Sequence, residues 1–499
     1  MAGRSSKNIG GLAARRRRNI WIWVSAAVVV VVAVATAVVL TVRPWTEEFR
    51  HGGLKIEAAP SPQAPAPQLS AASATAPAPS KQGLSSALAG VAASPDLGSF
   101  SGSVTDAVTG DVLWSKDADK PIIPASTAKI LTAAAALLVL PSDHRVTTKI
   151  VAAPGSNTLV LVGGGDPTLT AQADGKGYYT DGPELSDLVS QIRATGRTFT
   201  SILVDNSAFT GPTQAPGWDP ADIAGGSWAP IESVMLDGGR VNPLVEYSPR
   251  TPTPALDAGR RLALSLGMDP ASVRAGRAAA GAATVAKVQS APLHDRLTQM
   301  MTHSDDVLAE TIGREIAVAA GSEPSFSGAA KATLTALNAA GFDTTGVVLH
   351  DNSGLSTDDR VPARLLNKLL TEAAGSPGAA RTTSTQTTGA QTTGTQSASV
   401  AGTADSSADP LAPLLDYLPV GAGTGSLAYR FTTPKDHVAA GWVRAKTGTL
   451  SVSSALAGYV LDNDGRVLTF ALMSNDRPPE ASRPALDAVV ATLRNCGCS

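Results

Sequence analysis

Aromatic residues, histidines and net charge are all scarce in this chain of 499 residues. Phe, Trp and Tyr together make up 4% of it, so small side chains must fill much of the core. The formal charge of -2 argues against a nucleic-acid-binding protein, because such proteins usually carry a strongly basic face. The six histidines have no spacing typical of a metal site.

Cysteine is also rare, and Cys496 and Cys498 both lie at the end of the chain. Such a pair could form a small disulfide, supply two metal ligands, or have no role. We favour an oxidised, structural tail, because the rest of the chain has the features of an exported protein.

One long hydrophobic run lies near the N-terminus, from Ile20 to Val42, and four arginines at 15–18 precede it. As a helix it would rise about 34 Å, enough to cross a hydrocarbon core of about 30 Å. Because basic residues stay on the cytoplasmic side, the pattern predicts a single-pass anchor in the cell membrane, with the C-terminal bulk of the chain on the extracellular side. The alternative is a cleaved signal peptide with Ala35-Thr36-Ala37 as its cleavage motif, but its core would be unusually long.

Changes in composition along the chain predict its other boundaries. A basic cytoplasmic segment occupies 1–19 and the transmembrane anchor 20–42. The Pro-, Ala- and Ser-rich segment 43–95 has too little apolar bulk to fold and is interpreted as a stalk. Thr, Gln, Ser and Gly dominate 375–409, which we interpret as a surface insertion, since the entropy of loop closure grows slowly with length.

The remaining residues predict an α+β fold in which an antiparallel sheet is flanked by helices. The middle of the chain, 146–286, alternates strand-like runs with loops rich in Gly, Pro and Asp. We therefore expect a catalytic domain made of 96–145 and 287–499, with 146–286 as a large inserted domain. The elements expected around these boundaries are helices at Ser126–Leu140, Leu293–Ala320 and Pro484–Arg494, and strands at Val438–Thr449, Ser453–Leu461 and Arg466–Met473.

A first candidate motif, Ser126-Thr127-Ala128-Lys129, places a hydroxyl and an amine three residues apart. Residues i and i+3 share a helix face, so Lys129 can reach the Ser126 oxygen. A serine is a poor nucleophile until a base removes its proton, and a lysine with a lowered pKa can be that base. The alternative is an ordinary helix N-cap. No other serine in the chain has lysine three residues later, which favours catalysis.

A second candidate motif, Lys446-Thr447-Gly448-Thr449, lies on a predicted strand. A strand edge beside a nucleophile can bind an extended peptide by strand addition. Lysine and threonine would hold its terminal carboxylate there, and Gly448 would allow a close approach. The alternative is an edge strand protected by a lysine, but the order of the two motifs favours a catalytic pair.

Together these motifs resemble S-x-x-K and K-T-G of the serine penicillin-binding and β-lactamase group. From about Leu97 to Asn495 the chain resembles more narrowly the D-alanyl-D-alanine carboxypeptidase/endopeptidase family of low-molecular-mass class C penicillin-binding proteins. That family is known for a large domain inserted between its first and second motifs. Further stretches that carry the resemblance are 163–169, 351–356, 418–420 and 425–428.

The middle motif departs from that family, because it should read S-x-N and here Ser304 is followed by Asp305 and Asp306. Asparagine offers N–H donors to a substrate carbonyl, whereas an ionised aspartate only accepts. A carboxylate near Lys129 would also raise the pKa of that lysine and weaken it as a base. We expect Asp306 to be protonated, to turn toward a lysine, or to slow the enzyme.

The resemblance implies a penicillin-binding serine DD-peptidase that cuts the D-Ala-D-Ala stem peptides of peptidoglycan. Ser126 would attack the carbonyl of the penultimate D-Ala, Lys129 would take its proton, and Ser304 would pass a proton to the leaving amine. The N–H groups of Ser126 and Thr449 would form the oxyanion hole, and β-lactams would acylate Ser126. The resemblance also implies that no metal or organic cofactor is needed. The implied catalytic residues are Ser126, Lys129, Ser304, Asp306 and Lys446, and the implied substrate-binding residues are Thr447, Gly448 and Thr449.

Several alternatives stay open. The motifs do not separate carboxypeptidase from endopeptidase cleavage. A non-catalytic wall-binding scaffold with the same fold is supported by Asp306 alone, and the intact Ser126, Lys129 and Lys446 speak against it. A serine β-lactamase or esterase would share the motifs, but the long insertion and the anchor argue against it. Three residues of the middle segment, Asp205, Trp218 and Trp228, are interpreted as structural rather than as part of a peptidoglycan-binding surface.

Overall fold

The structure is a computed structural model of the chain. It describes residues 23, 29–41, 75–172, 175–375 and 409–497. Residues 1–71 and 72–499 form two separate units, and the second contains both candidate motifs. The predicted cytoplasmic segment, 1–19, lies outside the described residues.

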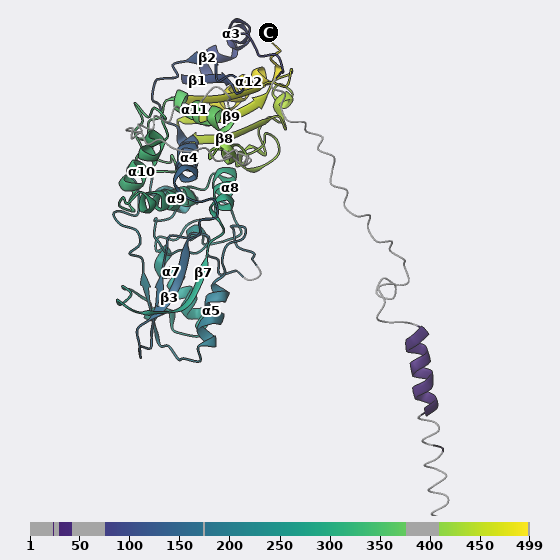
Figure 1. Cartoon of the computed structure of the whole chain (residues 1–499), viewed down its shortest axis with the longest axis vertical. Helices are drawn as coiled ribbons and strands as arrows, with labels where there is room; N and C mark the ends of the chain where they lie inside the picture. The colour runs from purple at the N-terminus through teal and green to yellow at the C-terminus, as the bar shows by residue number, and fades with distance from the viewer. Residues whose placement is uncertain (1–22, 24–28, 42–74, 173–174, 376–408, 498–499) are drawn as a thin grey trace, which may run out of the picture. The chain divides into compact units, whose positions relative to one another are not determined.

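The second unit contains an antiparallel sheet in the order β2-β1-β10-β9-β8, in the upper part of Figure 1. Leu456, Phe470 and Leu472 project from one face into a core with the last helix, α12. Ala455 and Ala457 alternate with them and face α11 and α4 on the other side, as the two-residue period of a strand requires. The bounds are β1 (Ser99–Asp106), β2 (Val112–Lys116), β8 (Val443–Leu450), β9 (Ser453–Leu461), β10 (Val467–Asn475), α11 (Ala363–Ala373) and α12 (Pro479–Asn495).

Two elements of this sheet layer begin elsewhere than predicted. Strand β8 starts five residues after the expected Val438, because residues 437–439 form a 3₁₀ turn and Gly441 takes a positive φ of 76°. Helix α12 starts before the expected Pro484, because Pro479 occupies its first turn instead. Both differences lie at element ends, and the antiparallel sheet flanked by helices is confirmed.

The prediction of an unfolded stalk is wrong for the last part of that segment. Within 43–95, residues 43–74 lie outside the described residues, but Lys81–Leu88 form helix α3. Leu84 and Leu88, one helical turn apart, are completely buried in the core beside α12. Two leucines on one face are thus enough to fold a segment whose composition is dominated by Ala, Ser and Pro.

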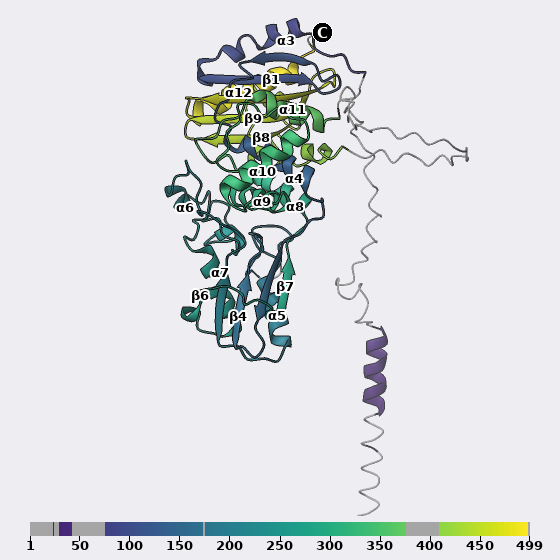
Figure 2. The same cartoon turned by 60° about the vertical axis from the view of Figure 1, so that its left-hand side comes forward.

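A second sheet is built from the middle of the chain, in the order β6-β5-β4-β3-β7, and lies below the first in Figure 2. Strands β4, β5 and β6 run parallel, while β3 pairs antiparallel with β4 and β7. The sheet has a hydrophobic core of its own with α5 and α7. The bounds are β3 (Thr147–Ala152), β4 (Thr158–Val162), β5 (Ser201–Asp205), β6 (Arg274–Ala275), β7 (Ala283–Gln289), α5 (Leu185–Ala194), α6 (Ala221–Gly225) and α7 (Pro254–Leu266).

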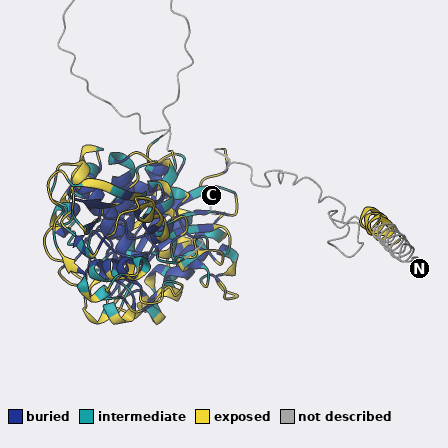
Figure 3. Cartoon of the chain, turned by 90° about the horizontal axis from the view of Figure 1, so that it is seen from below, coloured by how far each residue is buried: buried dark blue, intermediate teal, exposed yellow. Residues whose placement is uncertain are grey.

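Four helices lie between the two sheets in Figure 1 and share one core with the first sheet. The helix expected from Ser126 begins as a 3₁₀ turn, η3 (Ala125–Ala128), and continues as α4. The single helix expected over 293–320 is two helices, because Ser304 takes a left-handed conformation with φ 59°. Figure 3 shows the buried residues in dark blue, with exposed residues in yellow around them. The bounds are α4 (Lys129–Val139), α8 (Leu293–His303), α9 (Asp306–Ala319) and α10 (Phe326–Ala339).

The predicted single-pass membrane location is contradicted. Among the residues that the structure describes, no helix has both the length and the apolar character needed to span a bilayer. Of the expected anchor, 20–42, residues 23 and 29–41 are described, and they are helical.

Two further predicted segments lie largely outside the described residues. The Thr- and Gln-rich segment 375–409 is described only at its two end residues. Cys496 is buried and disulfide-bonded, as the oxidised tail requires, and Cys498 is not among the described residues.

Candidate active site

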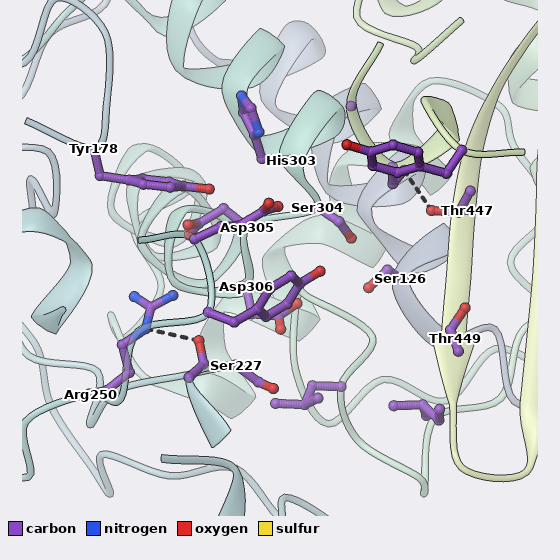
Figure 4. Close-up of a pocket in the computed structure, with 18 of the residues that line it drawn as sticks. Ser126, Tyr178, Ser227, Arg250, His303, Ser304, Asp305, Asp306, Thr447 and Thr449 are labelled. Atoms are coloured by element: carbon purple, nitrogen blue, oxygen red, sulfur yellow. Dashed lines mark hydrogen bonds between the residues drawn. The ribbon is translucent and has the colours of Figure 1, made fainter. Parts of the chain in front are cut away.

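The structure brings the first motif to the floor of a cleft of about 530 Å³. Ser126 lies in the 3₁₀ turn and Lys129 is the first residue of α4, so the two side chains share one face. The Lys129 Nζ donates to Ser126 Oγ at 3.1 Å. Lys129 is completely buried, whereas Ser126 lines the cleft, where Figure 4 shows it between Ser304 and the strand with Thr447.

The turn that carries Ser126 has a strained backbone and packs closely against β8. Ala125 takes a positive φ of 46°, which is strained for a residue with a side chain. A Cβ on Gly448 of β8 would lie 2.8 Å from the Pro124 oxygen and 3.1 Å from Ser126 N. Glycine at 448 is therefore needed for contact between strand and turn, in addition to the substrate approach expected from the sequence.

Ser304 and Lys446 meet at the same cleft although they are far apart in the sequence. The left-handed residue Ser304 joins α8 to α9, and its Oγ accepts from Lys446 Nζ at 2.8 Å. Lys446 also donates to the Thr447 carbonyl at 2.8 Å. Burial, and secondly the charge of Lys129, hold the pKa of Lys446 well below its usual range.

Asp306, the first residue of α9, is turned toward Lys129. Its Oδ1 lies 2.5 Å from Lys129 Nζ, so of the three outcomes expected for this residue the turn toward a lysine is observed. Burial raises the pKa of the Asp306 carboxyl, and the Lys129 ammonium offsets only part of that shift. In this position Asp306 accepts a hydrogen bond from the candidate base.

Asp305, to which the sequence analysis gave no role, stabilises the junction between α8 and α9 beside Ser304. Its side chain caps α9 by accepting from Leu308 N at 2.8 Å, and it also accepts from Tyr179 Oη at 3.0 Å and Arg240 Nη2 at 3.1 Å. Burial alone would raise the pKa of Asp305, but Arg240 and its neighbours lower it to about 2. Aspartate is a preferred N-cap, and that preference could have located this helix start in the sequence.

Strand β8 is an edge strand of the first sheet. Its outer edge is occupied at Ala445, whose N–H donates to the Pro419 carbonyl at 3.0 Å, while Thr447 and Thr449 farther along line the cleft. The Thr447 hydroxyl donates to Ser426 Oγ at 2.7 Å. Ser426 lies within the recognised stretch 425–428 but had no expected role.

Arg483 of α12 is a cleft residue that the sequence analysis missed. Its Nε donates to Thr449 Oγ1 at 3.2 Å, and it lines the cleft with Arg430. Arg430 is paired with Asp487 at 2.6 Å, whereas no carboxylate of the described chain lies within 4.0 Å of Arg483. No sequence motif marks Arg483, because the fold alone brings α12 next to β8. The same described residues contain no cluster of three or more His, Cys, Asp or Glu side chains suited to a metal ion.

Sequence comparisons find carboxypeptidases that are similar to this chain. The chain is 49% identical over 426 residues to a carboxypeptidase of Mycobacterium tuberculosis, covering 84% of this chain and 86% of the relative. It is 46% identical over 465 residues to carboxypeptidase DacB of Mycolicibacterium smegmatis, covering 92% and 94%.

The fold matches penicillin-binding protein 4 of Haemophilus influenzae with a TM-score of 0.63 at 18% identity, over 83% of this chain and 98% of that one. A second structure of that protein holds a β-lactam. The family model of the D-Ala-D-Ala carboxypeptidase 3 (S13) family matches residues 84–252, 244–406 and 392–496. The resemblance predicted from the sequence is thus confirmed, and the chain belongs to the D-Ala-D-Ala carboxypeptidase 3 (S13) family.

Proposed function

We propose that this chain is a serine D-Ala-D-Ala carboxypeptidase that acts on peptidoglycan stem peptides through an acyl-enzyme on Ser126. The observation that carries the proposal is the 3.1 Å contact between Lys129 Nζ and Ser126 Oγ at the floor of the cleft. Family membership and the two mycobacterial carboxypeptidases support it. Release of D-Ala from a peptide that ends in D-Ala-D-Ala tests it.

In the proposed reaction, neutral Lys129 takes the hydroxyl proton of Ser126 while the oxygen attacks the carbonyl of the penultimate D-Ala. The C–N bond then breaks, and the leaving nitrogen receives a proton through Ser304. The 2.8 Å contact with Lys446 holds the Ser304 hydroxyl for this transfer. Water hydrolyses the ester in the second half of the reaction and returns Ser126 to its free form.

The substrate is proposed to add to the outer edge of β8 beyond the part occupied at Ala445. The N–H groups of Ser126 and Thr449 would stabilise the oxyanion. Lys446, Thr447 and Thr449 would hold the terminal carboxylate, and the packing role of Gly448 keeps the strand against the nucleophile. β-Lactams would acylate the same serine.

The proposal also includes a division of the chain into two domains. We infer that 146–286 is a domain inserted between the first and second motifs into a catalytic domain formed by 96–145 and 287–499. The separate hydrophobic core of the second sheet supports this division. The scaffold alternative is less well supported, because the contacts of Ser126 with Lys129 and of Ser304 with Lys446 are those that catalysis needs. The β-lactamase alternative is less well supported because the matching family and the two mycobacterial relatives are carboxypeptidases.

Asp306→Asn is expected to leave D-Ala release equal or higher. The change restores the N–H donor and removes the carboxylate that accepts from Lys129 Nζ. The measurement is kcat/KM for a D-Ala-D-Ala peptide at neutral pH. A large loss would show that the Asp306 carboxylate itself takes part in the reaction.

Arg483→Ala is expected to raise KM for a peptide with a free C-terminal carboxylate by about three- to tenfold, because a charged donor beside Thr449 is lost. Arg483→Lys, which keeps the positive charge, should recover part of the affinity. The control substrate is the same peptide with a C-terminal amide, whose cleavage should respond much less. An equal rise in KM for both peptides would contradict a carboxylate-binding role.

A further inference from the structure

The completely buried Lys129 has three hydrogen-bond acceptors. Its Nζ lies 3.1 Å from Ser126 Oγ, 2.5 Å from Asp306 Oδ1 and 2.8 Å from the carbonyl oxygen of Ser353. In the ammonium form each acceptor takes one proton; in the neutral form that the proposed reaction requires, Asp306 and the Ser353 carbonyl take the two protons and the lone pair faces Ser126 Oγ. The Ser353 carbonyl belongs to neither catalytic motif, and it helps to set the direction in which the amine points toward Ser126.

The Ser353 carbonyl is itself held through the plane of its peptide group. A peptide group is planar, so fixing its N–H also fixes its oxygen. The group that joins Ser353 to Gly354 donates its N–H to Asp351 Oδ1 at 2.7 Å. The other oxygen, Asp351 Oδ2, accepts the indole N–H of Trp218 at 2.7 Å. A chain of contacts therefore runs from Trp218 through Asp351 and this peptide group to Lys129.

The preceding peptide group is fixed from helices α9 and α4. Glu310 Oε1 accepts from Asn352 N at 2.9 Å and from Ser353 N at 2.8 Å. On the opposite side of the same peptide group, the Thr132 hydroxyl donates to the Asn352 carbonyl at 2.6 Å. All of these residues are buried, so water cannot replace a lost partner. The loop is thus held by two helices and by the indole of Trp218.

Trp218 comes from the segment between the first and second motifs and is 5% exposed. Its ring centroid lies 4.7 Å from that of Trp228 and 5.3 Å from that of Phe326. The described residues that line the catalytic cleft do not include Trp218. A phenylalanine at 218 could keep these ring contacts while losing the N–H, so the link to Asp351 can be tested separately from the packing.

We propose that Trp218 is a positioning residue for Lys129, acting through Asp351 and the peptide group between Ser353 and Gly354. This inference rests on the proposed function, because it concerns the base of that reaction. Without the indole N–H, one buried acceptor of Asp351 loses a donor, and the carboxylate shifts toward its remaining partners. The peptide group between Ser353 and Gly354 then shifts with Asp351, and Lys129 Nζ moves from its position beside Ser126 Oγ. A misaligned base slows proton transfer without changing substrate binding.

Trp218→Phe in the full chain is expected to lower kcat for D-Ala release, and the rate constant of acylation by a fluorescent penicillin, by about tenfold. KM for the peptide should stay within about twofold, since Trp218 lies outside the cleft. The matched control is Trp228→Phe. Trp228 is 1% exposed, and its indole donates to the Asp219 carbonyl at 3.1 Å, away from Lys129. That variant should keep the wild-type kcat.

A wild-type kcat in Trp218→Phe, or an equal loss in both variants, would overturn the proposal. If Trp218→Phe does not fold, Asp351→Asn tests the same path, because it replaces one of the two oxygens that accept from Trp218 and from the Gly354 N–H with little change in shape. An unchanged kcat in folded Asp351→Asn would then overturn the proposal. Failure of the proposed function is a separate result, since the wild-type chain itself would release no D-Ala and take no label.

Discussion

Replacing Lys129 with methionine is expected to reduce kcat/KM for D-Ala release by about a thousandfold or more, because no base remains to take the proton of Ser126. The other lysine of the cleft cannot substitute, since Lys446 Nζ bonds to Ser304 and to a main-chain carbonyl instead. The measurement is the steady-state rate of D-Ala release together with the rate of acylation by penicillin.

The single change also leaves the Asp306 carboxylate without its partner, and an orphaned buried charge costs about 3–5 kcal/mol of stability. The double variant Lys129→Met with Asp306→Asn removes both charges and separates loss of catalysis from loss of folding. Lys331→Met on the surface of α10 is the matched control and should keep full activity. A folded double variant with more than about a tenth of the wild-type rate would contradict the assignment of Lys129 as base.

Much of the first sheet could be predicted because its strands follow simple patterns. Residues 453–461 and 466–473 are strand-like, largely apolar runs on either side of an Asn-Asp-Gly turn, and both strands form within a residue or two of the expected ends. Helix α3 was missed because its two buried leucines stand in a segment whose average composition is that of a linker. The break at Ser304 was missed because helical periodicity continues on both sides of it.

The candidate site shows a similar division. Ser126 and Lys129 are neighbours on one turn, so their contact follows from local geometry. The contact between Lys446 and Ser304 spans 142 residues and was expected only because known motifs mark both ends. Arg483 carries no such mark, and only the packing of α12 beside β8 brings it to the cleft. Ser353 lies in the recognised stretch 351–356, but only the fold shows that its carbonyl accepts from Lys129.

Ser126→Ala is expected to remove covalent reaction altogether and to lower D-Ala release by about ten-thousandfold or more, because Ser126 is the hydroxyl of the described cleft residues that contacts Lys129. The change deletes one oxygen, and Lys129 keeps its contacts with Asp306 and the Ser353 carbonyl. The variant should therefore fold and still bind the peptide. Its thermal unfolding, compared with that of the wild type, checks that the loss is chemical.

The most direct test of the proposed function is to label the full chain with a fluorescent penicillin and compare the wild type with Ser126→Ala. Heat-denatured wild type serves as the control for non-specific reaction. We predict a stable covalent adduct on the folded wild type, mapped by mass spectrometry to the peptide that contains Ser126, and none on the variant. An adduct of equal yield on Ser126→Ala, or no adduct on either protein, would contradict the assignment of Ser126 as the nucleophile.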